Sequence, residues 1–190
     1  MDSFEQIVAK ILSHQGYWTK IGYKLDLTQE EKRLLNNPSM PRPEVDIVAF
    51  RPGENLLLWV ECKSYLDSGG VRYIAFNGEN NVHSKRFKVF NDDKMREIFA
   101  DKLVTQLLDE GLLQSKPDLK FCLVAGNIVN KNDRKKLHAH FEQRDWLLYD
   151  EFWVKKGLLA LAKTGYDNDV AVLTAKLFDR IGDDEWKMKE

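Results

Sequence analysis

Two acidic residues and a lysine stand at one end of an apolar stretch, where charged side chains are costly to bury. Residues 44–65 contain two strand-like runs separated by a segment with proline and glycine, a pattern that predicts a β-hairpin. A turn of either two or four residues places Asp46 directly across from Glu61. Because side chains alternate along a strand, Lys63 shares the face of Glu61. Three ionisable groups are therefore predicted to converge.

Opposed carboxylates repel each other, so a cation is expected between them. Mg²⁺ takes octahedral oxygen coordination, commonly with one or two carboxylates, waters and substrate phosphate. Asp46, Glu61 and the backbone carbonyl of Cys62 are the candidate ligands for Mg²⁺ or Mn²⁺. Lys63 is a candidate to orient or deprotonate an attacking water and to offset charge in the transition state. This chemistry suits hydrolysis of a phosphodiester bond.

A cross-strand ion network that faces water is the alternative interpretation of these residues, since the Glu-x-Lys tripeptide is common. The end of an apolar strand is an unusual place for such a network, and the register of the opposed acid favours an active site. Glu44 is an alternative first acid, because the period of two puts it on the face of Asp46. The register favours Asp46.

Asp46, followed across the hairpin by Glu61-Cys62-Lys63, resembles the PD-(D/E)xK nuclease superfamily, and within it the Mrr-like and Holliday-junction-resolvase-like branches. The resemblance implies a restriction-endonuclease-like fold, metal ligands at Asp46 and Glu61, and a catalytic lysine at Lys63. It also implies DNA as the substrate. Pro43 stands three residues before Asp46 instead of beside it, which departs from the family pattern.

Two helices are expected to supply further site residues. Apolar periodicity predicts a first helix with Ser3 as its N-cap, and Glu5 matches the acid that members of these branches often add to the metal site. A glutamate favoured by the helix macrodipole is an equally good interpretation of Glu5. A later helix is expected over residues 91–108, and its Gln106 would match a polar residue that resolvase-like nucleases present, although no local motif fixes it.

A basic segment downstream of the acids is the candidate nucleic-acid-binding surface. Arg72, Lys85, Arg86 and Lys88 concentrate positive charge there, and aromatic residues are interleaved with them, a mixture that suits contacts to phosphates and stacking on bases. Residues 83–90 are expected to form a strand, and the alternative interpretation of their basic residues is that they only protect the edge of that strand. The aromatic residues are Tyr65, Tyr73, Phe76 and Phe87.

The remaining segments predict the sheet that positions these groups. Strands are expected over residues 17–25, 119–125 and 146–149 in addition to the hairpin. The order helix, three antiparallel strands, helix, strand, helix, strand, helix predicts the α/β class, as a three-layer α/β/α fold with a central mixed five-stranded sheet. The strand over 119–125 follows a helical crossover and is expected to lie parallel to the strand before it.

We interpret residues 1–190 as a single domain. An insertion is expected at about 26–43, where prolines break regular structure before the hairpin, and closing helices are expected at about 151–181. The apolar residues of the last helix, between Val170 and Phe178, either cover the sheet or form a homodimer contact.

Composition limits the classes of function. A net charge of −1 does not show the overall basic charge typical of nucleic-acid-binding domains. Contacts to DNA must therefore come from basic residues concentrated around the active-site cleft. No apolar run approaches the length of a bilayer span and no signal peptide is evident, so no membrane association and a cytoplasmic location are expected. Cys62 and Cys122 lie in apolar runs, which indicates buried thiols in a reducing compartment.

The function expected from the sequence is that of a Mg²⁺-dependent endodeoxyribonuclease of the restriction, repair or recombination type. The alternative is a noncatalytic module of the same fold that binds nucleic acid or a protein partner. The intact set of Asp46, Glu61 and Lys63 counts against that alternative, because a binding module gains nothing from three costly converging charges. Common nucleotide-dependent enzymes are disfavoured, because no glycine-rich phosphate loop is present.

Overall fold

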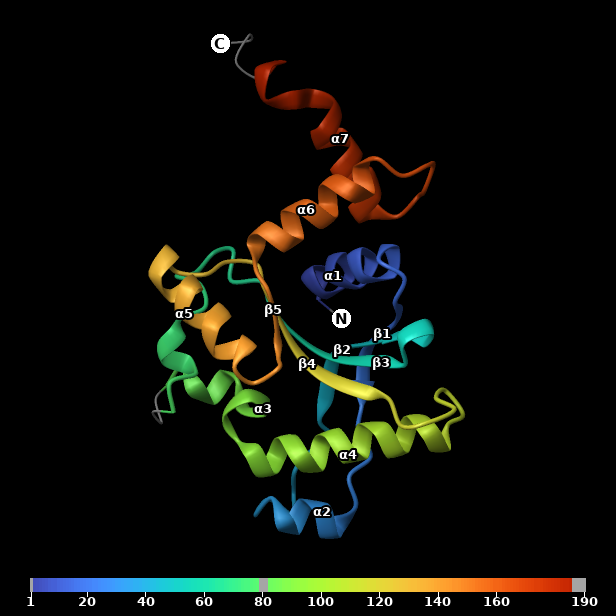
Figure 1. Ribbon diagram of the computed structural model, residues 1–190, viewed down its shortest axis with the longest axis vertical. Helices are drawn as coiled ribbons and strands as arrows, with labels where there is room; N and C mark the ends of the chain where they lie inside the picture. Colours follow the sequence, from blue (N-terminus) through green and yellow to red (C-terminus); the bar gives the residue numbers. More distant parts are fainter. Residues whose placement is uncertain (1, 79–81, 186–190) are drawn as a thin grey trace.

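A mixed sheet of five strands, in the order β1-β2-β3-β4-β5, forms the centre of the molecule (Figure 1). The computed structural model describes residues 2–78 and 82–185. β1, β2 and β3 are antiparallel neighbours, whereas β4 and β5 run parallel to β3. The predicted α/β class and the mixed five-stranded sheet are confirmed. The strands are β1 Trp18–Lys24, β2 Glu44–Arg51, β3 Leu56–Lys63, β4 Asp118–Ala125 and β5 Leu147–Tyr149.

Helices cover both faces of this sheet (Figure 1). α1 (Ser3–His14) and α6 (Glu151–Ala162) lie on one face, and α3 (Lys88–Asn91), α4 (Asp93–Asp109) and α5 (Lys131–Glu142) lie on the other. Each strand of the centre is apolar on both sides because both sides are covered.

Successive side chains of β3 point to opposite faces of the sheet and so pack in two separate cores. Leu57 and Trp59 pack in the larger core with α4 and α5, which we call the α4-side core. Leu58, Val60 and Cys62 pack in the smaller core with α1, which we call the α1-side core. A charged residue at the end of β3 is therefore directed to one core or the other by its position alone.

Helix caps account for most element boundaries. Thr28 and Glu31 form a capping box, and Asn130 and Asp150 cap the helices that follow them. The expected N-cap at Ser3 is wrong by one residue. Asp2 fills that role, since its side chain accepts a hydrogen bond from the backbone N–H of Phe4.

The strand expected over 83–90 is wrong. This segment forms a short 3-10 turn, η3 (Ser84–Arg86), and then α3. Phe87 and Phe90 are both buried, a spacing that belongs to a helix and not to a strand. The side-chain amide of Asn91 donates to the carbonyls of Ala75, Ser84 and Phe87, which ties the segment to the preceding turn η2 (Tyr73–Ala75).

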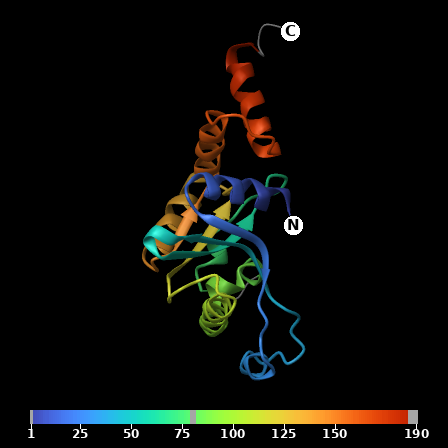
Figure 2. The same ribbon diagram turned by 90° about the vertical axis from the view of Figure 1, so that its right-hand side faces the viewer.

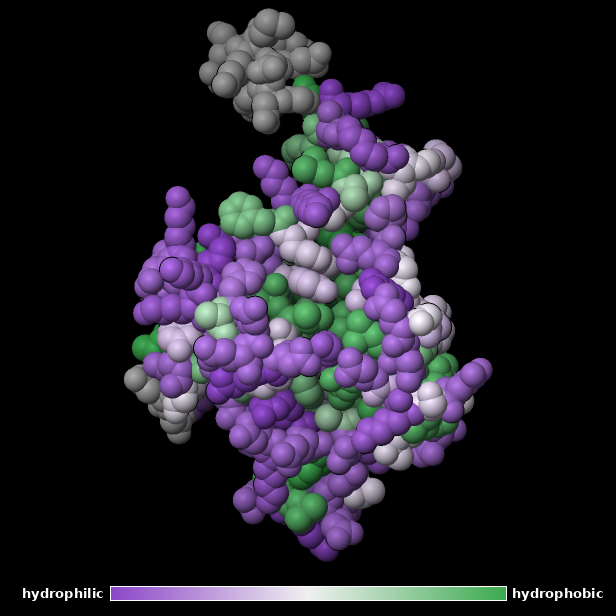
Figure 3. All heavy atoms as spheres, in the orientation of Figure 1, coloured by the Kyte–Doolittle hydropathy of each residue, from purple (hydrophilic) through white to green (hydrophobic). Residues whose placement is uncertain are grey.

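Two segments extend beyond the sheet layers, at opposite ends of the molecule (Figure 2). The insertion carries α2 (Gln29–Leu34), whose Glu31 lies 3.8 Å from the ammonium of Lys102 in α4. The last helix, α7 (Val170–Glu185), packs against α6 and not over the sheet. Apolar side chains of α7, including Leu177 and Phe178, reach the surface (Figure 3). No helix among the described residues is long and apolar enough to cross a membrane.

The contact of α6 with α1 depends on Gly157. A Cβ atom on Gly157 would lie 2.5 Å from Cγ2 of Ile11. Alanine is the better helix former by about 1 kcal/mol, yet we expect Gly157→Ala to lower the free energy of unfolding by about 1 to 2 kcal/mol, because the side chain of Ile11 must move. Urea denaturation measures the change. A higher free energy of unfolding for Gly157→Ala than for the wild type would contradict the close contact of α6 with α1.

Candidate active site

The hairpin of β2 and β3 brings the two predicted acids together. The strands pair up to Ile47 opposite Val60, and a four-residue loop, Pro52–Asn55, joins them. In this register the next opposed residues are Asp46 and Glu61. The predicted register is confirmed from Arg51 opposite Leu56 to Ile47 opposite Val60, and the two acids follow at the open end of the hairpin.

The alternation of β2 breaks at Asp46. Val45 packs in the α4-side core but Ile47 packs in the α1-side core, although residues two apart in a strand normally share a face. In β1, Gly22 lies beside this point with φ of +66°, a conformation that glycine adopts readily. The carboxylate of Asp46 reaches β3, where Oδ2 accepts a hydrogen bond of 2.7 Å from the backbone N–H of Cys62.

The break also separates Asp46 from Glu44, the alternative first acid. Glu44 is exposed, and its carboxylate lies 3.8 Å from the ammonium of Lys24. No hydrogen bond from the described residues joins Glu44 to β3. The structure therefore favours Asp46 as the partner of Glu61.

Glu61 and Lys63 form an ion pair at the end of β3. The distance from Lys63 Nζ to Glu61 Oε1 is 2.6 Å, and the two side chains are 21% and 19% exposed. Glu61 is paired with Leu123 of β4 and Lys63 with Ala125, and both partners belong to the α4-side core. Neighbouring residues in register share a face, so this ion pair lies on the α4 side of the sheet.

Burial and mutual repulsion alter the ionisation of these groups. Burial, and next the charge of Glu61, raise the pKa of Asp46 to about 6, while the hydrogen bond from Cys62 and the charge of Lys63 act in the opposite direction. Burial alone would lower the pKa of Lys63, but the carboxylate of Glu61 outweighs it and the pKa is raised. Lys63 is therefore an ammonium at neutral pH.

The two carboxylates fit a hard divalent cation. In the described part of the chain, Asp46 Oδ1 and Glu61 Oε2 accept no hydrogen bond, so each acid retains an oxygen for a ligand. No group of three or more His, Cys, Asp and Glu side chains among the described residues is placed to hold an ion. An ion here would take two side-chain carboxylates and complete its shell with waters, substrate and backbone oxygen, the last predicted at Cys62.

The thiol of Cys62 is not one of these candidate metal ligands. It points into the α1-side core, where it is buried with the other free cysteine, Cys122. Burial raises the pKa of the Cys62 thiol. The predicted buried thiols are confirmed, and only the main chain of Cys62 faces the acids.

Glu5 is near this end of the sheet but has a different partner. Its Oε2 accepts a hydrogen bond of 3.1 Å from the backbone N–H of Asp2, which completes the capping box of α1. Glu5 lies in α1, which covers the opposite face of the sheet from the ion pair of Glu61 and Lys63. The structure thus gives Glu5 a capping role at the start of α1, which the sequence analysis did not predict, and no contact of Glu5 with Asp46 or Glu61 is seen among the described residues.

Gln106 lies beside the end of β1. Its amide donates to the carbonyl of Lys24 and to Glu110, both at 3.1 Å, and its oxygen accepts from the backbone N–H of Asp26 at 3.0 Å. These bonds hold the chain that leaves β1 against α4. The structure does not bring Gln106 into contact with the acids.

The basic residues of the predicted nucleic-acid surface are all exposed. They are Arg72, Lys85, Arg86 and Lys88. Two of the aromatic residues interleaved with them are unavailable for base stacking, because Phe76 and Phe87 are buried with their ring centroids 4.7 Å apart. Tyr65 and Tyr73 are half-buried.

Sequence reasoning missed the residues that fix the loop after β3. Asn127 donates to the carbonyls of Tyr65 and Ser68, and its own carbonyl accepts from Val71. A Cβ atom on Gly126 would lie 2.4 Å from the carbonyl oxygen of Ser64, so only glycine fits there. The Gly-Asn pair directly after β4 was the available signal.

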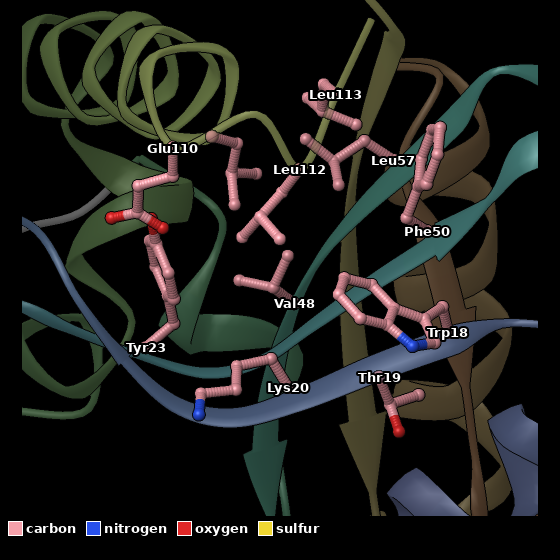
Figure 4. Close-up of a pocket in the computed structure, with 11 residues that line it drawn as sticks. Trp18, Thr19, Lys20, Tyr23, Val48, Phe50, Leu57, Glu110, Leu112 and Leu113 are labelled. Carbon is pink, nitrogen blue, oxygen red and sulfur yellow. The ribbon is translucent and has the colours of Figure 1, made fainter.

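A hollow of about 300 Å³ lies away from the acids, between β1 and the end of α4 (Figure 4). It is mainly apolar, with Val48, Phe50 and Leu57 on its walls and Trp18 at its edge. The hydroxyl of Tyr23 donates to Glu110 in the same hollow. None of the predicted site residues lines it.

Comparisons with protein-family models, with curated proteins and with solved structures gave no match for this chain.

Proposed function

We propose that the protein is a metal-dependent nuclease that hydrolyses phosphodiester bonds in DNA. The observation that carries this proposal is that Asp46 and Glu61 both lie at the open end of one hairpin. There Asp46 accepts a hydrogen bond from the backbone N–H of Cys62, the residue after Glu61, and the ammonium of Lys63 lies 2.6 Å from Glu61. The choice of DNA, of cutting within the strand and of Mg²⁺ or Mn²⁺ comes from the resemblance to PD-(D/E)xK nucleases.

Asp46 and Glu61 would hold the ion, which when bound supplies a Lewis acid and lowers the pKa of a coordinated water. The hydrogen bond from Cys62 fixes the orientation of the Asp46 carboxylate. We assign Lys63 the role of a cation that orients the water and stabilises charge on the phosphate, because Glu61 keeps it protonated.

A noncatalytic module of the same fold is the second candidate. The observation that favours it is the ion pair itself, since Lys63 already balances the charge of Glu61 without a metal. Such a module would bind nucleic acid or a protein and would need no divalent cation.

Cleavage of DNA separates these two functions. Supercoiled, linear and branched DNA are incubated with the protein in Mg²⁺, in Mn²⁺ and in EDTA, beside the Glu61→Gln variant. We expect nicking or cutting that requires the metal and is lost in the variant. Binding of DNA without any cleavage would support the noncatalytic module instead, and cleavage that persists in EDTA would contradict the proposed mechanism.

Metal binding is expected to depend on Glu61. Calorimetry with Mn²⁺ or Mg²⁺ should give an affinity at least about tenfold weaker for Glu61→Gln than for the wild-type protein, because a charged ligand oxygen is lost. Glu44→Gln is the matched control, since Glu44 is exposed and faces Lys24. Equal affinities for the wild type and Glu61→Gln would contradict the metal site.

A further inference from the structure

A small basic pocket lies at the end of β3, beyond the candidate active site. Its volume is about 210 Å³, and its polar walls come from Tyr65, Ser68, Arg72, His83 and Arg86. None of the described residues that line it is acidic.

The pocket borders the α4-side core, which lies on the same side of the sheet as the ion pair. Its apolar floor includes Val71 and Phe87, which belong to the α4-side core. Glu61 and Lys63 lie on that side too, because they pair in register with two residues of the same core. Tyr65, in the pocket wall, follows Lys63 by two residues in the chain.

The pocket wall is a fixed loop. Val71 and Ile128 form a β-bridge, and Val71 N–H donates to the carbonyl of Asn127 at 2.9 Å. Gly70 has φ of +83°, and a Cβ atom there would lie 2.9 Å from the backbone nitrogen of Val129. The geometry of the pocket is therefore set by the two loops that leave β3 and β4.

Arg72 and Arg86 have no ion-pair partner among residues 2–78 and 82–185. The guanidinium of Arg72 bends back over the loop, where Nη2 is 3.2 Å from the position of a Cβ atom on Gly69. Four other arginines do pair with a carboxylate: Arg42, Arg51, Arg96 and Arg134.

We propose that this pocket binds a phosphate group of the nucleic-acid strand, next to the bond that the candidate active site hydrolyses. This inference rests on the proposed nuclease function for the identity of the strand. A guanidinium group can donate two parallel hydrogen bonds to the oxygens of one phosphate. Two arginines without an ion-pair partner around a small hollow therefore favour a phosphate as the ligand over an anion that acts as a single point charge. The phosphate is either internal to the strand or at its end.

The proposed phosphate site distinguishes two pairs of basic residues that were predicted from the sequence as one nucleic-acid-binding surface. Arg72 and Arg86 line the pocket, whereas Lys85 and Lys88 are exposed outside it. Lys85 and Arg86 are neighbours in η3, so they differ in direction but hardly in distance from the acids. Lys85→Gln is therefore a matched control for Arg86→Gln.

Binding is measured in EDTA, where the proposed metal-dependent cleavage cannot contribute. The probes are short oligothymidylates with and without a 5′-phosphate, followed by fluorescence anisotropy, and inorganic phosphate, followed by NMR of the arginine side chains. We expect Arg72→Gln and Arg86→Gln each to weaken oligonucleotide binding about tenfold. Lys85→Gln should weaken it less than about threefold, as for a single exposed charge.

The oligonucleotides also identify the source of the phosphate. A preference for the 5′-phosphorylated strand that disappears in Arg86→Gln indicates a terminal phosphate. Equal binding of both strands, weakened equally in Arg86→Gln, indicates an internal one. Binding that falls no further in Arg86→Gln than in Lys85→Gln overturns the pocket even if DNA is cleaved. Absence of cleavage with intact pocket binding counts against the nuclease and leaves the pocket in place.

Discussion

Replacement of Lys63 by methionine is expected to lower metal-dependent cleavage of DNA by about 10² to 10⁴. Methionine retains the length and apolar stem of lysine but removes the ammonium, which lies 2.6 Å from Glu61 and has a raised pKa. The loss should appear in the rate of the chemical step, because substrate contacts of the exposed basic residues remain. Single-turnover cleavage with protein in excess measures that rate.

The controls for Lys63 must separate catalysis from folding. Lys63→Met leaves Glu61, which is 19% exposed, without its partner, and this alone destabilises the protein. Lys63→Arg keeps a cation at the position and should recover part of the activity. Lys94→Met, on an exposed lysine of α4 with no proposed role in the site, should leave single-turnover cleavage nearly unchanged. Activity of Lys63→Met within about threefold of wild type would contradict a role for the ammonium in the reaction.

The hairpin could be predicted because local rules determine it. The turn residues set the loop, the loop sets the register, and the register places Asp46 across from Glu61. The parallel position of β4 likewise follows from the helical connection that precedes it. Each of these predictions depends on residues that are close in sequence or on a general rule of chain connection.

Tertiary contacts decided the features that the sequence did not reveal. Residues 83–90 have an apolar and basic pattern that fits a strand, but the amide of Asn91 and the packing of Phe87 and Phe90 select a turn and a helix. The break at Asp46 lies beside Gly22, which has a positive φ and belongs to β1, a strand that is distant in sequence.

The side-chain directions of the two additional candidate site residues, Glu5 and Gln106, could not be predicted from the sequence either. Glu5 and Gln106 were suggested by resemblance, without any local motif that would fix their direction. In the structure, the hydrogen bond of Glu5 to Asp2 caps a helix, and those of Gln106 secure the end of β1. The side chain of Glu5 is directed by its nearest neighbours, and that of Gln106 by a strand remote in the chain.

Asp46→Asn is expected to abolish cleavage and yet stabilise the metal-free protein at pH 8. The native pKa of about 6 lies above the ordinary value of 3.8, so the folded state holds the proton more tightly than the unfolded state does. The stability that the protonated acid provides is complete below about pH 4 and is lost as the pH rises through 6. Asparagine cannot ionise, and its oxygen can still accept the hydrogen bond from Cys62.

At pH 8 the free energy of unfolding of Asp46→Asn is expected to exceed that of the wild type by about 1 to 2 kcal/mol. This gain is smaller than the free energy that corresponds to the whole pKa shift, because Asp46 is partly exposed. At pH 4 the two proteins should be nearly equal, and urea denaturation in EDTA at both values measures the difference. Mg²⁺ at ten times its dissociation constant should add about 1.4 kcal/mol to the wild type and little to the variant. A variant less stable than wild type at both pH values would mean that Asp46 supports the fold and not a cation, because an acid retained for metal binding must cost stability when the metal is absent.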